Sequence, residues 1–113
     1  MRRLLALALL TVVAYAADLS GTWSAAVALA GGNGGTATFE FKQTGNKITG
    51  TYSGALGNAN VTGAMNGNKV EWSFENEQAG KISYSGTIGS DNKIKGTVEY
   101  GQLGMGTFTA EKK

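Results

Sequence analysis

The feature that most constrains the fold is a four-residue turn-and-strand motif that occurs three times along the chain. It reads Gly-Asn-Lys-Ile at 45–48, Gly-Asn-Lys-Val at 67–70 and Asp-Asn-Lys-Ile at 91–94, so its asparagines are 22 and then 24 residues apart. Asn and Gly tolerate the positive φ angles that tight hairpin turns require. Because this spacing equals one strand out and one strand back, the three turns are predicted to lie at the same end of an up-and-down sheet.

Around these turns the chain alternates apolar and polar residues in short segments, with no helical period. Such segments, bounded by Gly, Asn and Asp, predict β-strands. The expected strands are 20–29, 35–43, 46–54, 59–66, 68–75, 80–88, 92–100 and 104–111. Eight evenly spaced strands without long crossovers favour an all-β fold, an eight-stranded antiparallel up-and-down β-barrel, because closure removes the exposed sheet edges.

A period of two assigns one face of each strand to the barrel interior. The expected interior residues are Leu19, Trp23, Val27, Ala37, Phe39, Phe41, Ile48, Tyr52, Val61, Met65, Val70, Trp72, Phe74, Ile82, Tyr84, Ile88, Ile94, Val98, Tyr100 and Phe108. The same face carries Gly21, Gly50, Gly63, Gly86 and Gly96. Glycine within a strand marks a bend or a close approach. These positions therefore either let the wall coil and make room for large rings opposite them, or shape a ligand cavity.

Residues 1–16 have the pattern of a signal peptide. Arg2 and Arg3 give a positive start, 4–13 form an apolar run, and Ala-Tyr-Ala at 14–16 is a small-x-small cleavage site. The apolar run is well short of the ~20 residues of a spanning helix. We therefore expect a single barrel domain at 17–113, exported to the periplasm or the extracellular space. The mature chain is expected to have no membrane span and to be a monomer or a weak homo-oligomer.

Charge and composition argue against several classes of function. Without Arg2 and Arg3 the chain has eight lysines and eight acids, which alternate along the sequence. No nucleic-acid partner is expected, because that partner requires a basic face. The chain has no Cys and no His, which removes most nucleophile–base pairs and transition-metal sites. We expect neither catalysis nor a cofactor; Glu75 and Glu77 form the one close carboxylate pair, either a solvated loop or a weak calcium site.

Three segments resemble the calycins, the group of barrels that includes lipocalins, fatty-acid-binding proteins and avidins. Gly-Thr-Trp at 21–23 is similar to the Gly-x-Trp signature of their first strand. Residues 48–59, Ile-Thr-Gly-Thr-Tyr-Ser-Gly-Ala-Leu-Gly-Asn-Ala, resemble the third strand and following loop of avidin and streptavidin, and Val-Glu-Trp at 70–72 resembles the strand that supplies a ligand-packing tryptophan. The resemblance implies the same barrel, with Tyr52, Asn58 and Trp72 at biotin-contacting positions.

Most of the other polar positions that recognise the ureido group of biotin in avidin-like proteins differ in this chain. The residues at those positions are Ala25, Leu29, Gly54, Gly80, Ile82 and Gly106. A site built on hydrogen bonds loses much of its affinity when the partners are missing. The resemblance therefore implies a similar fold without tight biotin binding.

The connections between the repeated turns are expected to be longer and to share the opposite end of the barrel. They are 30–35, 54–59, 75–80 and 100–104. Because ligands enter such barrels at one open mouth, a site is expected at that end. The candidate ligand-binding residues are Tyr52, Asn58, Trp72, Tyr84 and Tyr100.

The expected function is non-catalytic binding of a small apolar, aromatic or sugar-like ligand at this mouth. The alternative is a structural or envelope-associated barrel whose interior is filled and which has no ligand. The interior volume separates the two hypotheses. Rings that meet across the lumen favour the structural protein, whereas a cavity of several hundred Å³ favours binding.

Overall fold

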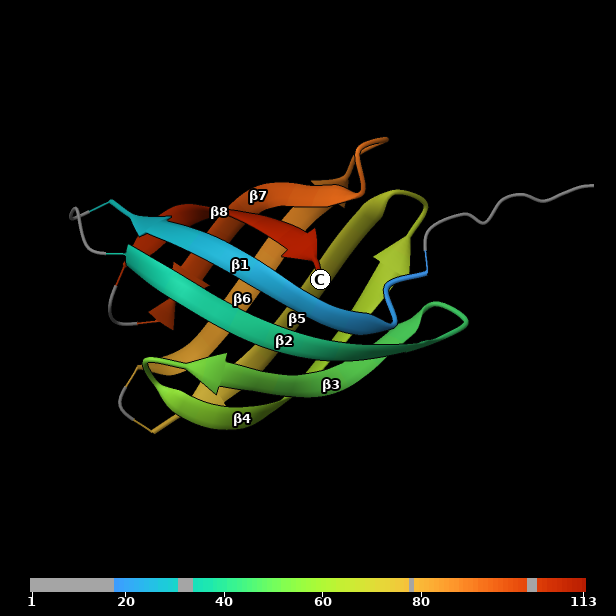
Figure 1. The fold of residues 1–113 in the computed structure, drawn as a ribbon. Helices are drawn as coiled ribbons and strands as arrows, with labels where there is room; N and C mark the ends of the chain where they lie inside the picture. Colours follow the sequence, from blue (N-terminus) through green and yellow to red (C-terminus); the bar gives the residue numbers. More distant parts are fainter. Residues whose placement is uncertain (1–17, 31–33, 78, 102–103) are drawn as a thin grey trace, which may run out of the picture.

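The chain forms a closed antiparallel barrel of eight strands in sequence order (Figure 1). The structure is a computed structural model that describes residues 18–30, 34–77, 79–101 and 104–113. The strands are β1 Gly21–Leu29, β2 Gly34–Thr44, β3 Lys47–Gly54, β4 Gly57–Asn66, β5 Lys69–Asn76, β6 Gly80–Ile88, β7 Lys93–Tyr100 and β8 Met105–Lys112. β8 pairs with β1 from Trp23↔Lys112 to Leu29↔Gly106, which closes the sheet.

This architecture confirms the predicted fold class, and the strands lie within two residues of their expected bounds. One connection is different. The segment 54–59 was expected to be a long loop, but β3 ends at Gly54 and β4 begins at Gly57, so only two residues connect them. The predicted signal peptide lies outside the described residues. Within the described part of the chain, no helix is long and apolar enough to cross a bilayer.

The repeated Asn-Lys turns lie at one end of the barrel, as predicted. Gly45 and Gly67, each the first residue of a two-residue turn, have φ angles of 61° and 64°, a left-handed conformation that glycine adopts without steric cost. The carbonyls of Asn46 and Asn68 each accept a backbone hydrogen bond of 2.8 Å, from Met65 and Ile88 respectively. Each of these two turns is therefore bonded to the end of the second strand that follows it, β4 for the first turn and β6 for the second.

The N-terminal side of β1 packs under this end of the barrel. The Trp23 indole N–H donates to the carbonyl of Leu19 at 2.9 Å, and both side chains are fully buried. The Leu19 N–H in turn donates to Oε1 of Gln43 at 2.8 Å, and the Gln43 N–H donates to the Ser20 hydroxyl. These bonds connect the start of β1 to the end of β2 and close this end, which we call the closed end.

Aromatic rings fill the middle of the barrel. Every predicted interior residue is buried except Tyr100, which is partly buried. Phe39 lies 5.4 Å from Trp72 and 5.1 Å from Tyr84, measured between ring centroids, and Trp72 stacks on Tyr84 at 5.1 Å with an interplanar angle of 10°. Phe108 packs edge-on against Trp72 and Tyr84. Rings from opposite walls therefore meet across the lumen.

The inward glycines mark places where neighbouring backbones approach closely. A Cβ built on Gly50 would lie 1.8 Å from the carbonyl oxygen of Glu40, and one on Gly63 would lie 2.1 Å from that of Glu71. The atoms that exclude a side chain there belong to the next strand and not to a ring across the lumen. Glycine therefore allows the wall to coil tightly, which is one of the two roles expected for it.

We expect Gly50→Ala to destabilise the protein by about 1–3 kcal/mol, because the added methyl group forces two backbones apart. Gly35→Ala is the matched control, since an added Cβ at Gly35 meets nothing within 4 Å. Its free energy of unfolding is expected to change by about 0.5 kcal/mol or less. Urea unfolding of both variants measures the difference, and equal losses would contradict this account of Gly50.

Trp72→Ala is expected to cost about 3–5 kcal/mol, because the indole is 2% exposed and contacts four rings from three other strands. Thr62→Ala, at an exposed position of β4, is the control and is expected to change stability by about 0.5 kcal/mol or less. The measurement is again chemical unfolding. A loss below about 1 kcal/mol for Trp72→Ala would show that the ring cluster is not the core of the fold.

Candidate functional site

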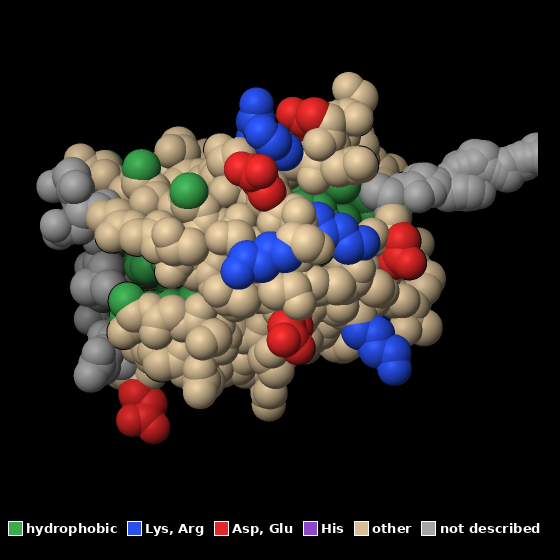
Figure 2. All heavy atoms as spheres, viewed as in Figure 1, with side chains coloured by type: hydrophobic (Ala, Val, Ile, Leu, Met, Phe, Trp, Pro, Cys, Tyr) green, Lys and Arg blue, Asp and Glu red, His purple; other side chains and the backbone are tan. Residues whose placement is uncertain are grey.

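The end of the barrel opposite the closed end has an apolar hollow of about 280 Å³, which we call the mouth. Its lining residues are Val27, Leu29, Gly34, Gly35, Thr36, Ala37, Tyr52, Ala55, Leu56 and Tyr100. They come from the end of β1, the start of β2, the β3–β4 hairpin and the end of β7. Figure 2 shows hydrophobic side chains in a hollow at this end of the molecule. No charged side chain is among the lining residues.

Tyr52 lies at one wall of the mouth with its ring buried and its hydroxyl at the β3–β4 hairpin. The ring stacks on Phe74 at 4.2 Å with an interplanar angle of 18°, and the hydroxyl oxygen accepts the N–H of Leu56 at 3.2 Å. The ring also covers Gly54, where an added Cβ would lie 2.6 Å from the Tyr52 hydroxyl. A side chain at position 54 therefore competes with this arrangement of Tyr52.

Two further tyrosines meet below and beside the mouth. The hydroxyls of Tyr84 and Tyr100 are 3.0 Å apart and share a hydrogen bond. Tyr84 is fully buried in the ring cluster, whereas Tyr100 is partly buried and lines the hollow. Tyr100 of β7 is opposite Ile82 of β6, which is two residues before Tyr84, so the two tyrosines are diagonal neighbours across the ladder. Because one is in the ring cluster and the other lines the hollow, the pair connects the core to the mouth.

Burial is the main electrostatic influence on these phenols. It raises the pKa of Tyr84 well above its ordinary value of 10.0, and the hydrogen bond to Tyr100 raises it further. Burial also raises the pKa of Tyr100, against the opposing effect of its bond to Tyr84. Both groups are therefore neutral hydroxyls at physiological pH, and they present hydrogen-bonding groups without charge.

The structure brings together some of the predicted site residues and separates others. Tyr52 and Tyr100 line the mouth, and Tyr84 lies beneath it. Trp72 is enclosed in the ring cluster and does not line the mouth. Asn58 is exposed on the outer wall: it is opposite Ser53 in the β3–β4 ladder, and its neighbour Ala59 takes the inward position. Its expected place in a loop is therefore wrong, because β4 begins at Gly57 and extends through it.

The carboxylates Glu75 and Glu77 are both exposed, at the end of β5 and in the turn that follows. Among the described residues, no group of three or more His, Cys, Asp and Glu side chains comes together to hold a metal ion. Asn76, between these two acids, has a structural role instead. Its Nδ2 donates to the carbonyl of Leu56 at 3.0 Å and its Oδ1 accepts the N–H of Ala79 at 3.0 Å, which connects two hairpins near the mouth.

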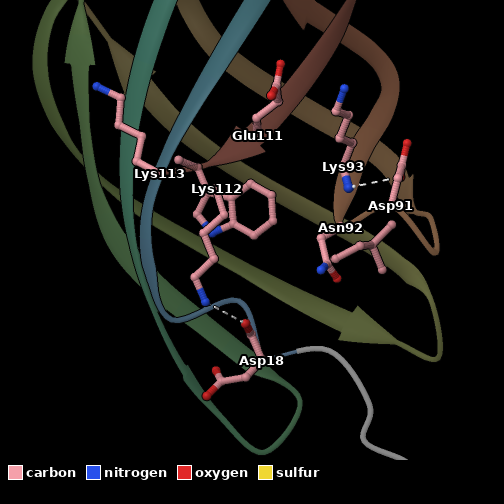
Figure 3. Close-up of a pocket in the computed structure, with 9 residues that line it drawn as sticks. Asp18, Asp91, Asn92, Lys93, Glu111, Lys112 and Lys113 are labelled. Atoms are coloured by element: carbon pink, nitrogen blue, oxygen red, sulfur yellow. Dashed lines mark hydrogen bonds between the residues drawn. The ribbon is translucent and has the colours of Figure 1, made fainter.

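A second hollow, of about 370 Å³, lies at the closed end (Figure 3). Its lining residues are Asp18, Trp23, Ile88, Asp91, Asn92, Lys93, Glu111, Lys112 and Lys113. Figure 3 shows Lys112 reaching toward Asp18, whose carbonyl accepts its ammonium hydrogen bond at 3.2 Å. The Ser20 N–H holds the pKa of the Asp18 carboxyl below its usual range. This rim is mixed in charge and largely exposed, whereas the mouth is uncharged and apolar.

Sequence reasoning missed several residues that line the mouth. The sequence patterns indicate Leu29 only as a departure from the avidin pattern, and they do not indicate Gly35 or Leu56 as site residues. The alternation that placed Val27 and Ala37 inward extends one step further along each strand, to Leu29 and Gly35. That extension was the available signal. Leu56 belongs to the two-residue hairpin and has no such periodic signal.

The stability of the protein is expected to fall above about pH 10, and Tyr84 is expected to contribute to the fall. A folded-state pKa raised above the unfolded value means that the stabilising form is neutral, so the stabilisation is complete below pH 10 and is lost as the pH rises. Tyr84→Phe lacks this group. The gap in free energy of unfolding, wild type minus variant, should therefore fall as the pH rises above 10. Urea unfolding at pH 8 to 11 measures the gap, and a constant gap would contradict the assignment.

Comparison with known proteins adds no family to this description. No protein-family model, no curated protein and no solved structure matches the chain. The chain is a closed, eight-stranded, all-antiparallel β-barrel with an apolar mouth at one end.

Proposed function

We propose that this chain is an exported, non-catalytic binding protein that holds a small apolar or aromatic compound at the mouth of its barrel. The observation that carries the proposal is the lining of the mouth, which combines apolar side chains with Tyr52 and Tyr100 and includes no charged side chain among the described residues. Ligand sites typically combine an apolar wall with a few polar groups that fix orientation. Export rests on the signal-peptide pattern of residues 1–16.

The same geometry argues for a site at the mouth and not in the lumen. Phe39, Trp72 and Tyr84 meet at centroid distances of 5.1–5.4 Å, so a ligand in the middle of the barrel has to displace the core itself. The mouth has a volume of about 280 Å³, near the lower limit of ~300 Å³ for pockets that hold drug-sized ligands. A compound with a single ring fits this size.

A distant relation to the calycins is consistent with this proposal. The motif Gly-Thr-Trp at 21–23 and the segment 48–59 resemble that group, and a closed antiparallel meander barrel is its architecture. Biotin is a poor candidate ligand, because Asn58 is on the outer wall and Trp72 is enclosed by other rings. Tyr52 remains near the mouth, but its hydroxyl oxygen already accepts a backbone hydrogen bond.

The second candidate function is a structural or envelope-associated barrel without a ligand. The packing of rings across the lumen favours it, because a filled interior serves stability alone. The two candidates differ in what they expect of the mouth. A binding protein uses the hollow, whereas in a structural barrel the hollow has no occupant and tolerates being filled.

A thermal-shift screen with small aromatic compounds, sugars, lipids and biotin distinguishes the candidates. Gly35 is on the inward face of β2 beside Val27, with open space around it. Gly35→Phe is therefore expected to fill the mouth and to abolish stabilisation by any compound that binds there. Ala26→Phe, on the outer face of β1, is the control and is expected to retain it. Biotin is expected to bind no tighter than roughly micromolar, since several buried polar partners are missing.

Two results would count against binding at the mouth. One is a screen in which no small compound stabilises the protein, which favours the structural barrel. The other is stabilisation that Gly35→Phe leaves unchanged, which places the ligand elsewhere. Nanomolar binding of biotin would show that the missing ureido contacts are replaced by other residues.

A further inference from the structure

We propose that the ligand of the mouth is an uncharged single-ring compound with a carbonyl group, whose oxygen accepts hydrogen bonds from tyrosine hydroxyls. This inference rests on the proposed function and adds the chemical class of the ligand. It follows from counting the hydroxyl hydrogens that the described residues leave without an acceptor, and from the charges that are absent from the lining. The count begins with Tyr52, which is 2% exposed and lines the mouth.

A tyrosine hydroxyl has one hydrogen to donate and an oxygen that accepts. At Tyr52 the oxygen accepts the Leu56 N–H, and this is its one hydrogen bond among the described residues. The hydroxyl hydrogen is therefore not used within the described protein. A buried donor without an acceptor costs about 1–3 kcal/mol, so an acceptor that enters the mouth satisfies a group that the fold leaves open.

The Tyr84–Tyr100 pair leaves a second donor. Its two hydroxyls have two hydrogens, but the 3.0 Å contact between their oxygens uses one. When Tyr84 donates to Tyr100, the hydrogen of Tyr100 is free, and Tyr100 is the member of the pair that lines the mouth. In that arrangement Tyr52 and Tyr100 each keep one hydroxyl hydrogen that no described residue accepts, and each can donate it to a lone pair of a carbonyl oxygen.

The lining also argues against a charged ligand. Among the described residues it includes no Lys, Arg, Asp or Glu side chain, so these residues offer no counter-ion to a carboxylate or an ammonium group. Burying a charge without a partner costs far more than burying a carbonyl that is hydrogen-bonded. Apolar contacts from Val27, Leu29 and Leu56 suit the ring of the ligand, while the tyrosines suit its one acceptor.

Four probes of similar size test this assignment: toluene, acetophenone, benzoate and benzylamine. Each is titrated into the protein while the NMR signals of the residues that line the mouth are followed. Acetophenone is expected to bind about three- to tenfold more tightly than toluene, the gain of one or two net hydrogen bonds. Benzoate and benzylamine are expected to bind at least about tenfold more weakly than acetophenone.

Three variants assign the gain to particular hydroxyls. Tyr52→Phe and Tyr100→Phe are each expected to reduce the preference for acetophenone over toluene, and the double variant is expected to abolish it. Thr62→Ala, at an exposed position of β4 outside the mouth, is the control: it changes none of these hydroxyls, so the preference is expected to remain. Toluene binding should be similar in all variants, which shows that each one is folded and has an intact mouth.

The outcomes separate this inference from the proposed function. Toluene binding at the mouth without any preference for acetophenone overturns the carbonyl assignment and leaves the proposed function standing. Tighter binding of benzoate than of acetophenone also overturns it. If none of the four probes shifts the signals of the mouth and the wider screen finds no ligand, the proposed function itself is wrong.

Discussion

The packing of aromatic rings around Phe39 is the interaction on which the rest of the structure depends. Phe39 is fully buried, and the rings of Phe41, Tyr52, Trp72, Phe74 and Tyr84 have centroids 5.1–6.4 Å from its own. They come from β2, β3, β5 and β6. The cluster therefore connects the β2–β3 pair to the β5–β6 pair, and these two pairs share no backbone hydrogen bonds with each other. Each such ring pair contributes about 0.5–1.5 kcal/mol beyond its buried area. The chain has no Cys for a disulfide, so this packing holds the walls together.

The close approach of the strands makes that packing possible. Gly86 and Gly96 are opposite each other on β6 and β7, and a Cβ on Gly96 would lie 2.0 Å from the Ser85 carbonyl oxygen. Where the inward side chain is a hydrogen atom, the wall coils inward and the lumen narrows. Large rings at other inward positions then reach across it. This packing leaves one buried polar group unpaired: the indole N–H of Trp72 has no hydrogen-bond acceptor among the described residues.

A filled lumen determines where a ligand can bind. The uncharged, apolar hollow among the described residues lies at the mouth, where Leu29, Gly35 and Leu56 line it, whereas the hollow at the closed end has a charged rim. Tyr52 and Tyr100 belong to both regions, since their rings contact Phe74 and Tyr84 of the ring cluster and both residues line the mouth. The aromatic core therefore supplies both the stability of the barrel and the polar groups of the candidate site.

The sequence by itself determined the strands, their order, their inward faces and the position of the Asn-Lys turns, because a period of two and turn chemistry are local properties. Tertiary structure decided the site. Asn58 follows turn-forming glycines, yet pairing with β3 draws it into a strand whose alternation turns it outward. The enclosure of Trp72 depends on Phe41 and Phe108 from other strands. The bond between Tyr84 and Tyr100 depends on the register of β6 and β7, which no local pattern encodes.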